Sequence, residues 1–284
     1  FAGLQCAIAV SAAAIFPLFD RMPEIFLWAF GISQNYSFIL AVQVAISLIL
    51  MLLPTIFIGA TFPCALQLVS KDLPRIGFDV GRVYAANTVG AILGSFAAGF
   101  ILIPIIGVQA SIKAAILINL FIGMTLFLFV RQRILIRVVE ASGIAAAAWG
   151  VLFLPAWDQQ MMSSGASIYA PIFLSNSRTR ALSFRDNIKG DDLLFYKDGI
   201  SATVTVHERY PHTLYLRVNG KTDASTDVDM HTQLMVGHLA ALLHPNPKSA
   251  LVIGLGSGVT VGALAQYDLD KIDVVEIEPA VVEA

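Results

Sequence analysis

The stretch Ala250-Leu-Val-Ile-Gly-Leu-Gly-Ser-Gly-Val-Thr260 decides the fold of the C-terminal part of the chain. A short apolar run ends in three closely spaced glycines, and a second apolar run, Lys271-Ile-Asp-Val-Val-Glu-Ile-Glu278, follows after a helix-like segment. Glycine lets a strand turn tightly into a helix whose free N–H groups face a ligand. The pattern predicts a nucleotide-binding β-α-β unit.

An acid at the end of the second run indicates which class of nucleotide this unit would bind. Glu276 follows Gly258 by eighteen residues, a position from which a carboxylate can accept hydrogen bonds from both hydroxyls of a ribose. The dinucleotide fingerprint requires glycine at its sixth position, which is Val259 here. The spacing therefore favours an S-adenosylmethionine-type ligand over NAD. The alternative is a tight strand-to-helix turn that binds no ligand.

The chain divides into two halves of different composition. It is 57% hydrophobic and only 13% charged. Eight basic and five acidic residues lie in the part up to Pro155, whereas ten basic and fifteen acidic residues follow it. An acidic, soluble-looking second half argues against nucleic acid as a partner.

The first half contains apolar runs of the length that crosses a bilayer, about 20 residues as helix. We expect five spans, at 1–19, 37–59, 85–106, 112–130 and 141–156. The chain opens inside an apolar run without a basic leader, which predicts a fragment rather than a signal peptide.

Basic loop residues predict the orientation of these spans. They form two groups, Lys71, Arg75 and Arg82, and Arg131, Arg133 and Arg137, and both loops should face the cytoplasm. If 141–156 crosses, the second half lies on the opposite face, where S-adenosylmethionine-like ligands are not expected. Either segment 141–156 is a half-span, or the rule that basic loops face the cytoplasm does not hold here. The side of the membrane on which the second half lies therefore stays open.

Three further patterns precede the glycine stretch. Polar, turn-rich sequence over 157–189 predicts a linker or irregular entry segment. Alternating β-branched runs at 201–207 and 213–219 predict an antiparallel hairpin within 190–228. From 229 to 243 we expect an amphipathic helix; its apolar face comprises Met230, Leu234, Met235, Leu239, Leu242 and Leu243.

In this order of elements the sequence resembles the spermidine synthase (polyamine aminopropyltransferase) family, and more closely its multi-spanning membrane-fused branch. The similarity is good from about residue 190 onward and looser in the apolar half. The residues that carry it are 216–221, His238, 244–248, 251–258 and 274–279, with 59–63 and 81–90 on the membrane side.

The resemblance implies a fold class. We expect a multi-span α-helical membrane region over 1–156, the linker, the β-hairpin subdomain, and over 229–284 the start of a doubly wound, Rossmann-like α/β domain of the S-adenosylmethionine-dependent transferase type. We also expect the chain to be truncated at both ends. In the family this domain binds decarboxylated S-adenosylmethionine, and an aminopropyl group passes to an amine such as putrescine.

Residue by residue, the resemblance implies two sets of ligand contacts. The nucleotide set is Gly254, Gly256, Ser257, Gly258, Glu276 and Glu278, although Ser257 stands where the soluble enzymes have an acid. The weaker acceptor set is Asp223, Asp227, Asp229 and Gln233. The Tyr-His-Glu of the family aligns with Thr232, Gln233 and Leu234, and the usual glutamine falls near Asp223. The three aspartates could partner a cationic amine, and the alternative is a solvated acidic loop. The catalytic aspartate of the family follows a later strand, beyond Ala284, so catalytic residues stay unassigned.

Two other functions fit the same residues. One is an S-adenosylmethionine-dependent methyltransferase-like enzyme, and the other is a non-enzymatic transporter or sensor with a polyamine- or nucleoside-binding domain. In each case we expect an integral protein of the cell (inner or plasma) membrane that uses no metal. The expected partners are the lipid bilayer and a small amine, and a homo-oligomer is left open.

Overall fold

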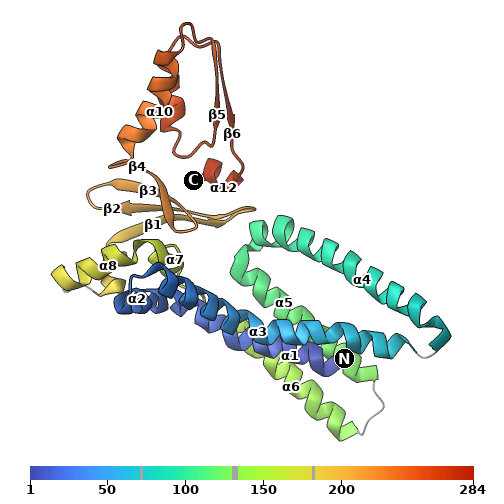
Figure 1. Cartoon of the computed structure of the whole chain (residues 1–284). Helices are drawn as coiled ribbons and strands as arrows, with labels where there is room; N and C mark the ends of the chain where they lie inside the picture. The colour runs from blue at the N-terminus through green and yellow to red at the C-terminus, as the bar shows by residue number, and fades with distance from the viewer. Residues whose placement is uncertain (71–72, 130–133, 181–182) are drawn as a thin grey trace. The chain divides into compact units, whose positions relative to one another are not determined.

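The computed structural model describes residues 1–70, 73–129, 134–180 and 183–284. It forms two compact units, one of Phe1–Met22 with Ile32–Trp157 and the other of Pro23–Gly31 with Asp158–Ala284 (Figure 1). Three of the loop cations used to predict orientation, Lys71, Arg131 and Arg133, lie outside the described residues.

The first unit is helical. Its helices are α1 (Ala2–Ile15), the 3-10 helix η1 (Phe16–Arg21), α3 (Tyr36–Val69), the 3-10 turn η2 (Leu73–Arg75), α4 (Ile76–Ala97), the π-helical turn η3 (Ala98–Leu102), α5 (Ile103–Phe129) and α6 (Ile134–Leu152). Helix α2 (Met22–Ile32) follows η1 in the sequence, but its residues Pro23–Gly31 belong to the second unit. Helix α1 packs against α3 and α5, and α5 packs against α6. The core shared by α1, α5 and α6 is built on Ala9, Ile116, Leu120, Ile144 and Val151.

Within the described ranges, three helical stretches are long and apolar enough to cross a membrane, namely Ala2–Ile32, Tyr36–Val69 and Ile76–Phe129. The third stretch is interrupted at Gly107, whose φ of 79° and ψ of 166° are not helical. The predicted spans 85–106 and 112–130 lie on either side of that glycine, and Figure 1 shows the chain turning between α4 and α5. The number of crossings stays a prediction.

The second unit contains a four-stranded antiparallel sheet in sequence order, made of β1 (Asp191–Asp198), β2 (Thr203–Arg209), β3 (Thr213–Val218) and β4 (Lys221–Ser225). The predicted hairpin is confirmed as β2 and β3, which pair Val206 with Leu216. The two outer strands were not predicted. Strand β1 lacks alternation and β4 lacks β-branched or large apolar residues except for one threonine, so neither carries the usual strand pattern.

Short helices occupy the segment that the sequence suggested to be a linker. They are α7 (Gln159–Met162), α8 (Ala166–Arg180) and α9 (Phe184–Ile188). Asp158 caps α7 and Ser183 forms a capping box with Asp186 at the start of α9. Ala166 and Ala170 of α8 pack on Leu27 of α2. Two polar residues of this segment, Asp158 and Ser183, therefore begin helices, which is a common role of Asp and Ser.

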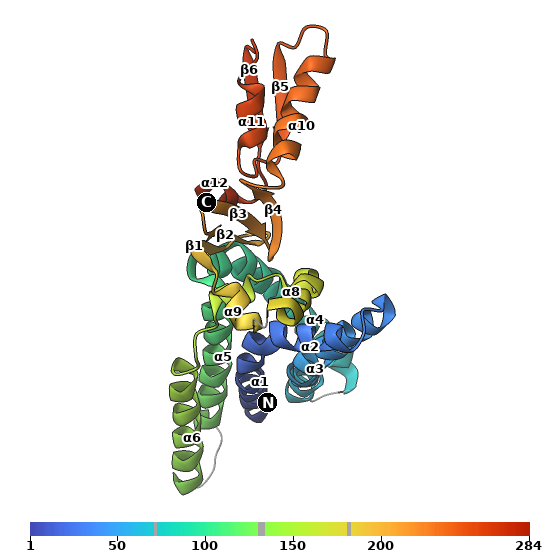
Figure 2. The same cartoon turned by 90° about the vertical axis from the view of Figure 1, so that its left-hand side faces the viewer.

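The predicted β-α-β unit is confirmed. It comprises β5 (Ser249–Ile253), α11 (Val259–Leu264) and β6 (Lys271–Val275), with α10 (Met230–Leu243) before it and α12 (Pro279–Glu283) after it. Strands β5 and β6 are parallel and pair Val252 with Val274, and Figure 2 shows them beside α10 and α11.

The expected apolar face of α10 is not the buried one. Leu239 is 45% exposed and Leu243 is 80% exposed, whereas Gly237 and Ala241 are buried. A Cβ on Gly237 would lie 2.8 Å from the Thr260 carbonyl oxygen and 2.9 Å from the Ala263 Cβ. The small residues therefore face α11, because the two helices approach too closely for larger side chains.

Candidate nucleotide-binding site

The loop between β5 and α11 depends on its glycines. Gly254, Gly256 and Gly258 have φ angles of 90°, 56° and 77°, a region that residues with a Cβ rarely adopt. The Gly254 N–H donates to the Val275 carbonyl at 2.8 Å, which joins the loop to the end of β6. The glycine spacing noted in the sequence thus forms a left-handed turn at the carboxyl ends of two parallel strands, where ligands of α/β sheets bind.

Glu276 holds this loop from the neighbouring strand. Its carboxylate accepts hydrogen bonds from the backbone N–H of Leu255 at 2.7 Å and of Glu278 at 3.0 Å. Backbone donation, first from Glu278 and then from Leu255, lowers the pKa of Glu276, so this side chain stays ionised at neutral pH. The backbone groups of Ile277 and Gly256 lower the pKa of Glu276 further, so the carboxylate is held by the loop and by its own strand end.

Glu278 is buried, with 3% of its surface exposed, and its hydrogen-bond donors come from the protein. It accepts from the backbone N–H and the hydroxyl of Ser201 at 2.7 and 2.8 Å, and from the N–H groups of Ala202 at 3.2 Å and Ala280 at 3.1 Å. Burial acts to raise the pKa of Glu278, but these donors outweigh it and lower the pKa. Glu278 therefore ties the turn between β1 and β2 to the start of α12.

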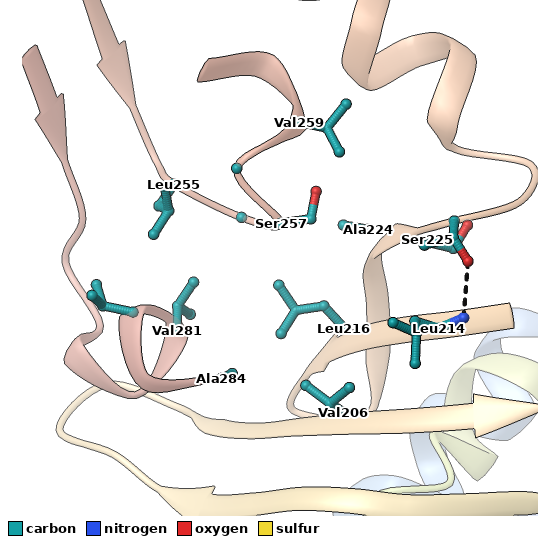
Figure 3. Close-up of a pocket in the computed structure, with 14 residues that line it drawn as sticks. Val206, Leu214, Leu216, Ala224, Ser225, Leu255, Ser257, Val259, Val281 and Ala284 are labelled. Atoms are coloured by element: carbon teal, nitrogen blue, oxygen red, sulfur yellow. Dashed lines mark hydrogen bonds between the residues drawn. The ribbon is translucent and has the colours of Figure 1, made fainter. Parts of the chain in front are cut away.

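Two cavities flank the glycine loop where it faces the antiparallel sheet. The first, of about 370 Å³, lies among Val206, Leu214, Leu255, Val259 and Val281 (Figure 3). The second, of about 390 Å³, lies on the side of Glu276 and Glu278. The two share six lining residues, so they form neighbouring chambers: Leu216, Ala224, Leu255, Gly256, Ser257 and Val281.

Most residues of the two predicted sets line these chambers. Gly256 and Ser257 line both, Gly258 lines the first, and the second contains Gly254, Asp223, Gln233, Glu276 and Glu278. Asp227 and Asp229 belong to neither lining. Asp229 instead accepts a hydrogen bond from the Ser225 hydroxyl at 3.1 Å in the turn before α10. The ligand contacts themselves stay predictions.

Gln233, predicted on the acceptor side, connects three elements. Its side-chain amide donates to the Ser225 carbonyl of β4 at 2.9 Å and accepts from the Ser257 hydroxyl of the glycine loop. Its backbone carbonyl accepts from the Thr260 hydroxyl of α11 at 2.9 Å. Both ends of the amide are thus engaged with the protein.

Sequence reasoning missed the contribution of the antiparallel sheet to the chambers. Ser201 and Ala202, in the turn before β2, and Leu216 of β3 form walls of the second chamber. The alternation of the hairpin contained part of the signal, since it places Val204, Val206, Leu216 and Val218 on one face. It did not indicate what that face covers.

The fold and the site define an α/β unit with a glycine-rich loop between two parallel strands, preceded by an antiparallel sheet. Residues 230–284 match the family model of the spermine/spermidine synthase domain. This match confirms the resemblance to the spermidine synthase family inferred from the motifs.

Curated relatives agree over longer stretches. A polyamine aminopropyltransferase of Corynebacterium efficiens is 28% identical over 239 residues, which are 80% of this chain and 41% of the relative. One of Leptospira interrogans is 22% identical over 82% of this chain and 43% of its own length. One of Clostridium botulinum is 47% identical over 51 residues, 18% of each chain. The chain thus spans about two fifths of the length of the first two relatives.

Proposed function

We propose that the protein is a membrane-anchored aminopropyltransferase that moves an aminopropyl group from decarboxylated S-adenosylmethionine to an amine. The observation that carries this proposal is Glu276, an ionised carboxylate beside a left-handed glycine loop that opens into two adjoining chambers. The names of the relatives support the same activity. Glu276 would accept the ribose hydroxyls, and the glycine loop would let the nucleoside approach the backbone.

The reaction is a displacement at carbon. The lone pair of a neutral amine forms a C–N bond to the carbon beside the sulfonium, the C–S bond breaks, and its electron pair leaves with sulfur as methylthioadenosine. The new ammonium then loses a proton to solvent or to a basic group. Two adjoining chambers suit this reaction, because alignment of two substrates supplies much of the rate of such a transfer.

The apolar half of the chain supports the proposed membrane anchoring. The three stretches that are long enough to cross a bilayer expose large apolar side chains, among them Leu48, Ile49 and Met51 of α3. Hydrocarbon solvates such surfaces without cost, and helices satisfy their own backbone groups there. The proposed location is the cell membrane, either the inner or the plasma membrane.

Ligand binding tests the donor site directly. In the full-length protein in detergent, Glu276→Gln should weaken binding of decarboxylated S-adenosylmethionine at least tenfold by calorimetry, because hydrogen bonds to a charged acceptor contribute about 1.5–3 kcal/mol each. Glu283→Gln is the matched control, since Glu283 lines neither chamber and pairs with Lys197 at 2.5 Å.

Assays of the same full-length protein distinguish the three candidate functions. Release of methylthioadenosine in the presence of an amine supports the proposal. Preference for S-adenosylmethionine without that product would replace it with the methyltransferase-like alternative. Uptake of polyamine into vesicles without turnover would replace it with the transporter.

A further inference from the structure

Aromatic and polar side chains gather where α1, α5 and α6 pack together (Figure 1). Phe16 directly follows α1, Lys113 belongs to α5, and Trp157 lies beyond the end of α6. The ring centroids of Phe16 and Trp157 are 4.8 Å apart, and the Trp157 Nε1 donates to the Phe16 carbonyl at 3.1 Å. The Lys113 ammonium lies 5.3 Å from the centroid of the Phe16 ring. The fold therefore joins one end of all three helices.

Polar side chains of α5 complete this junction. The Lys113 Nζ donates to the Leu154 carbonyl at 2.8 Å, and the Gln109 side-chain amide donates to the Pro155 carbonyl at 3.0 Å. The chain has left α6 at these two carbonyls, so they need donors from outside that helix. We call the four side chains of the junction the Phe16 cluster: Phe16, Gln109, Lys113 and Trp157.

The cluster coincides with the first charges of two apolar stretches. The stretch Ala2–Ile32 is 31 residues long, although about 20 residues cross a bilayer, and its first charged side chains are Asp20 and Arg21, just after Phe16. In the sequence of α5 the one charged residue is Lys113. A charge in the middle of a span is costly, whereas a lysine near its end extends its ammonium to the polar surface.

An aromatic pair on α6 faces outward at this same end. The ring centroids of Trp149 and Phe153 are 5.2 Å apart, and the two residues are 65% and 68% exposed. Ile144 and Val151 are buried in the core shared with α1 and α5, so the pair points away from that core. Trp149 lies about 5 Å along the helix axis before Leu152, the last residue of α6. Tryptophan is enriched where headgroups meet acyl chains, because its ring is apolar and its N–H is polar.

We infer that the Phe16 cluster and the aromatic pair of Trp149 and Phe153 mark the boundary between membrane and water, so that this end of α1, α5 and α6 contacts phospholipid headgroups. The Lys113 ammonium lies at the level of the lipid phosphates, and Trp149 lies where the acyl chains begin. The part of α5 in hydrocarbon therefore starts near Lys113, and Gln109 lies outside it. This inference rests on the proposed membrane anchoring and is independent of the transfer reaction.

Quenching by brominated lipids measures the depth of Trp149. The full-length protein is reconstituted into phosphatidylcholine vesicles whose acyl chains carry bromine either near the headgroup or near the chain end. The fluorescence that is present in the wild-type protein and missing in Trp149→Phe belongs to Trp149. Bromine near the headgroup should quench this signal about twofold more strongly than bromine near the chain end, because the ring lies at the boundary.

Leu52→Trp is the matched control for depth. Leu52 is 53% exposed and lies near the middle of α3, which spans Tyr36–Val69. The signal that this variant adds to the wild-type fluorescence should be quenched more strongly by bromine near the chain end. Each of the two substitutions changes an exposed side chain, so the core between the helices stays intact.

The control separates the boundary assignment from the anchoring on which it rests. If neither lipid quenches the tryptophan added at position 52, the protein is not inserted, and the anchoring fails together with the assignment. If that tryptophan is deep, and Trp149 is quenched equally by both lipids, more strongly by deep bromine or by neither lipid, the boundary assignment alone is overturned. Should Trp149→Phe not fold, Phe153→Trp adds a ring at the same level, and the same comparison decides.

Discussion

Gly199 and Glu278 depend on each other although 79 positions separate them. A Cβ on Gly199 would lie 2.0 Å from one carboxylate oxygen of Glu278 and 2.6 Å from the other. Glycine is needed here for space, because the buried carboxylate occupies the position of a side chain. The spacing of Glu276 from the glycine loop could be read from the sequence, but the partners of Glu278 could not, since Ser201 is 77 residues away.

At the residue scale, Gly199→Ala should push the Glu278 carboxylate off its donors in the β1–β2 turn. A buried charged acceptor that loses its hydrogen bonds costs about 1–3 kcal/mol or more, which corresponds to a fall of several degrees in Tm. Thermal unfolding of the full-length protein measures this fall in Tm. Gly190→Ala is the control, because the nearest atom to its Cβ is 3.6 Å away. An equal Tm for the two variants would contradict the dependence.

At the scale of elements, the antiparallel sheet has two different faces. One packs Val204, Leu216 and Ala224 with Ala280 and Val281. The other carries an ionic cluster in which buried Asp191 accepts from Arg209 at 2.5 Å and from Arg217 at 3.1 Å. The period-two pattern predicted the apolar face of the central hairpin. It could not predict the cluster, because one of its members, Asp191, belongs to a strand without that pattern.

His207, within this cluster, should make the protein sensitive to acid. It is 1% exposed and contacts the Thr205 hydroxyl at 3.1 Å; burial, and next the charge of Arg217, lower the pKa of His207 to about 4. An unfolded histidine titrates near 6.5, so the unfolded state binds the proton more readily. The contribution of neutral His207 to the free energy of unfolding is therefore complete above pH 6.5. It falls by up to about 3 kcal/mol as the pH decreases toward 4.

The measurement is Tm against pH for the full-length protein and for His207→Gln. Carboxylates also contribute to acid unfolding, so the informative quantity is the difference in slope between pH 6.5 and 4. The variant should show the shallower slope. Parallel curves would mean that His207 binds a proton equally readily in the folded and the unfolded protein.

At the scale of the whole molecule, sequence and structure agree on an apolar first half and a more polar second half, but they differ on the unit to which some residues belong. Pro23–Gly31 groups with the second unit, although it lies among the apolar helices in the sequence. Hydropathy reports how a helix is solvated and not which neighbour it packs against, so Leu27 gave no sign of its contact with Ala166 and Ala170. Whether a segment forms a helix or a strand could therefore be predicted better than the elements against which it packs.

Membrane insertion is the prediction that belongs to this scale. The full-length protein should stay in the membrane fraction after an alkaline wash and enter solution only with detergent, because α3 alone exposes an apolar surface along 34 residues. Leu52→Lys, at a 53% exposed position of α3, should lower the inserted fraction, since a lysine at the middle of a span costs about 3 kcal/mol. Recovery of the wild-type protein in the alkaline wash would contradict the proposed anchoring.

The two acids that follow β6 fix the spacing between the walls of the site. Glu276 fastens the glycine loop and Glu278, two residues later, fastens the turn that begins β2. One short backbone segment therefore sets the distance between two walls that come from remote parts of the chain. A displacement of the backbone between Glu276 and Glu278 would therefore change the width of both chambers at the same time.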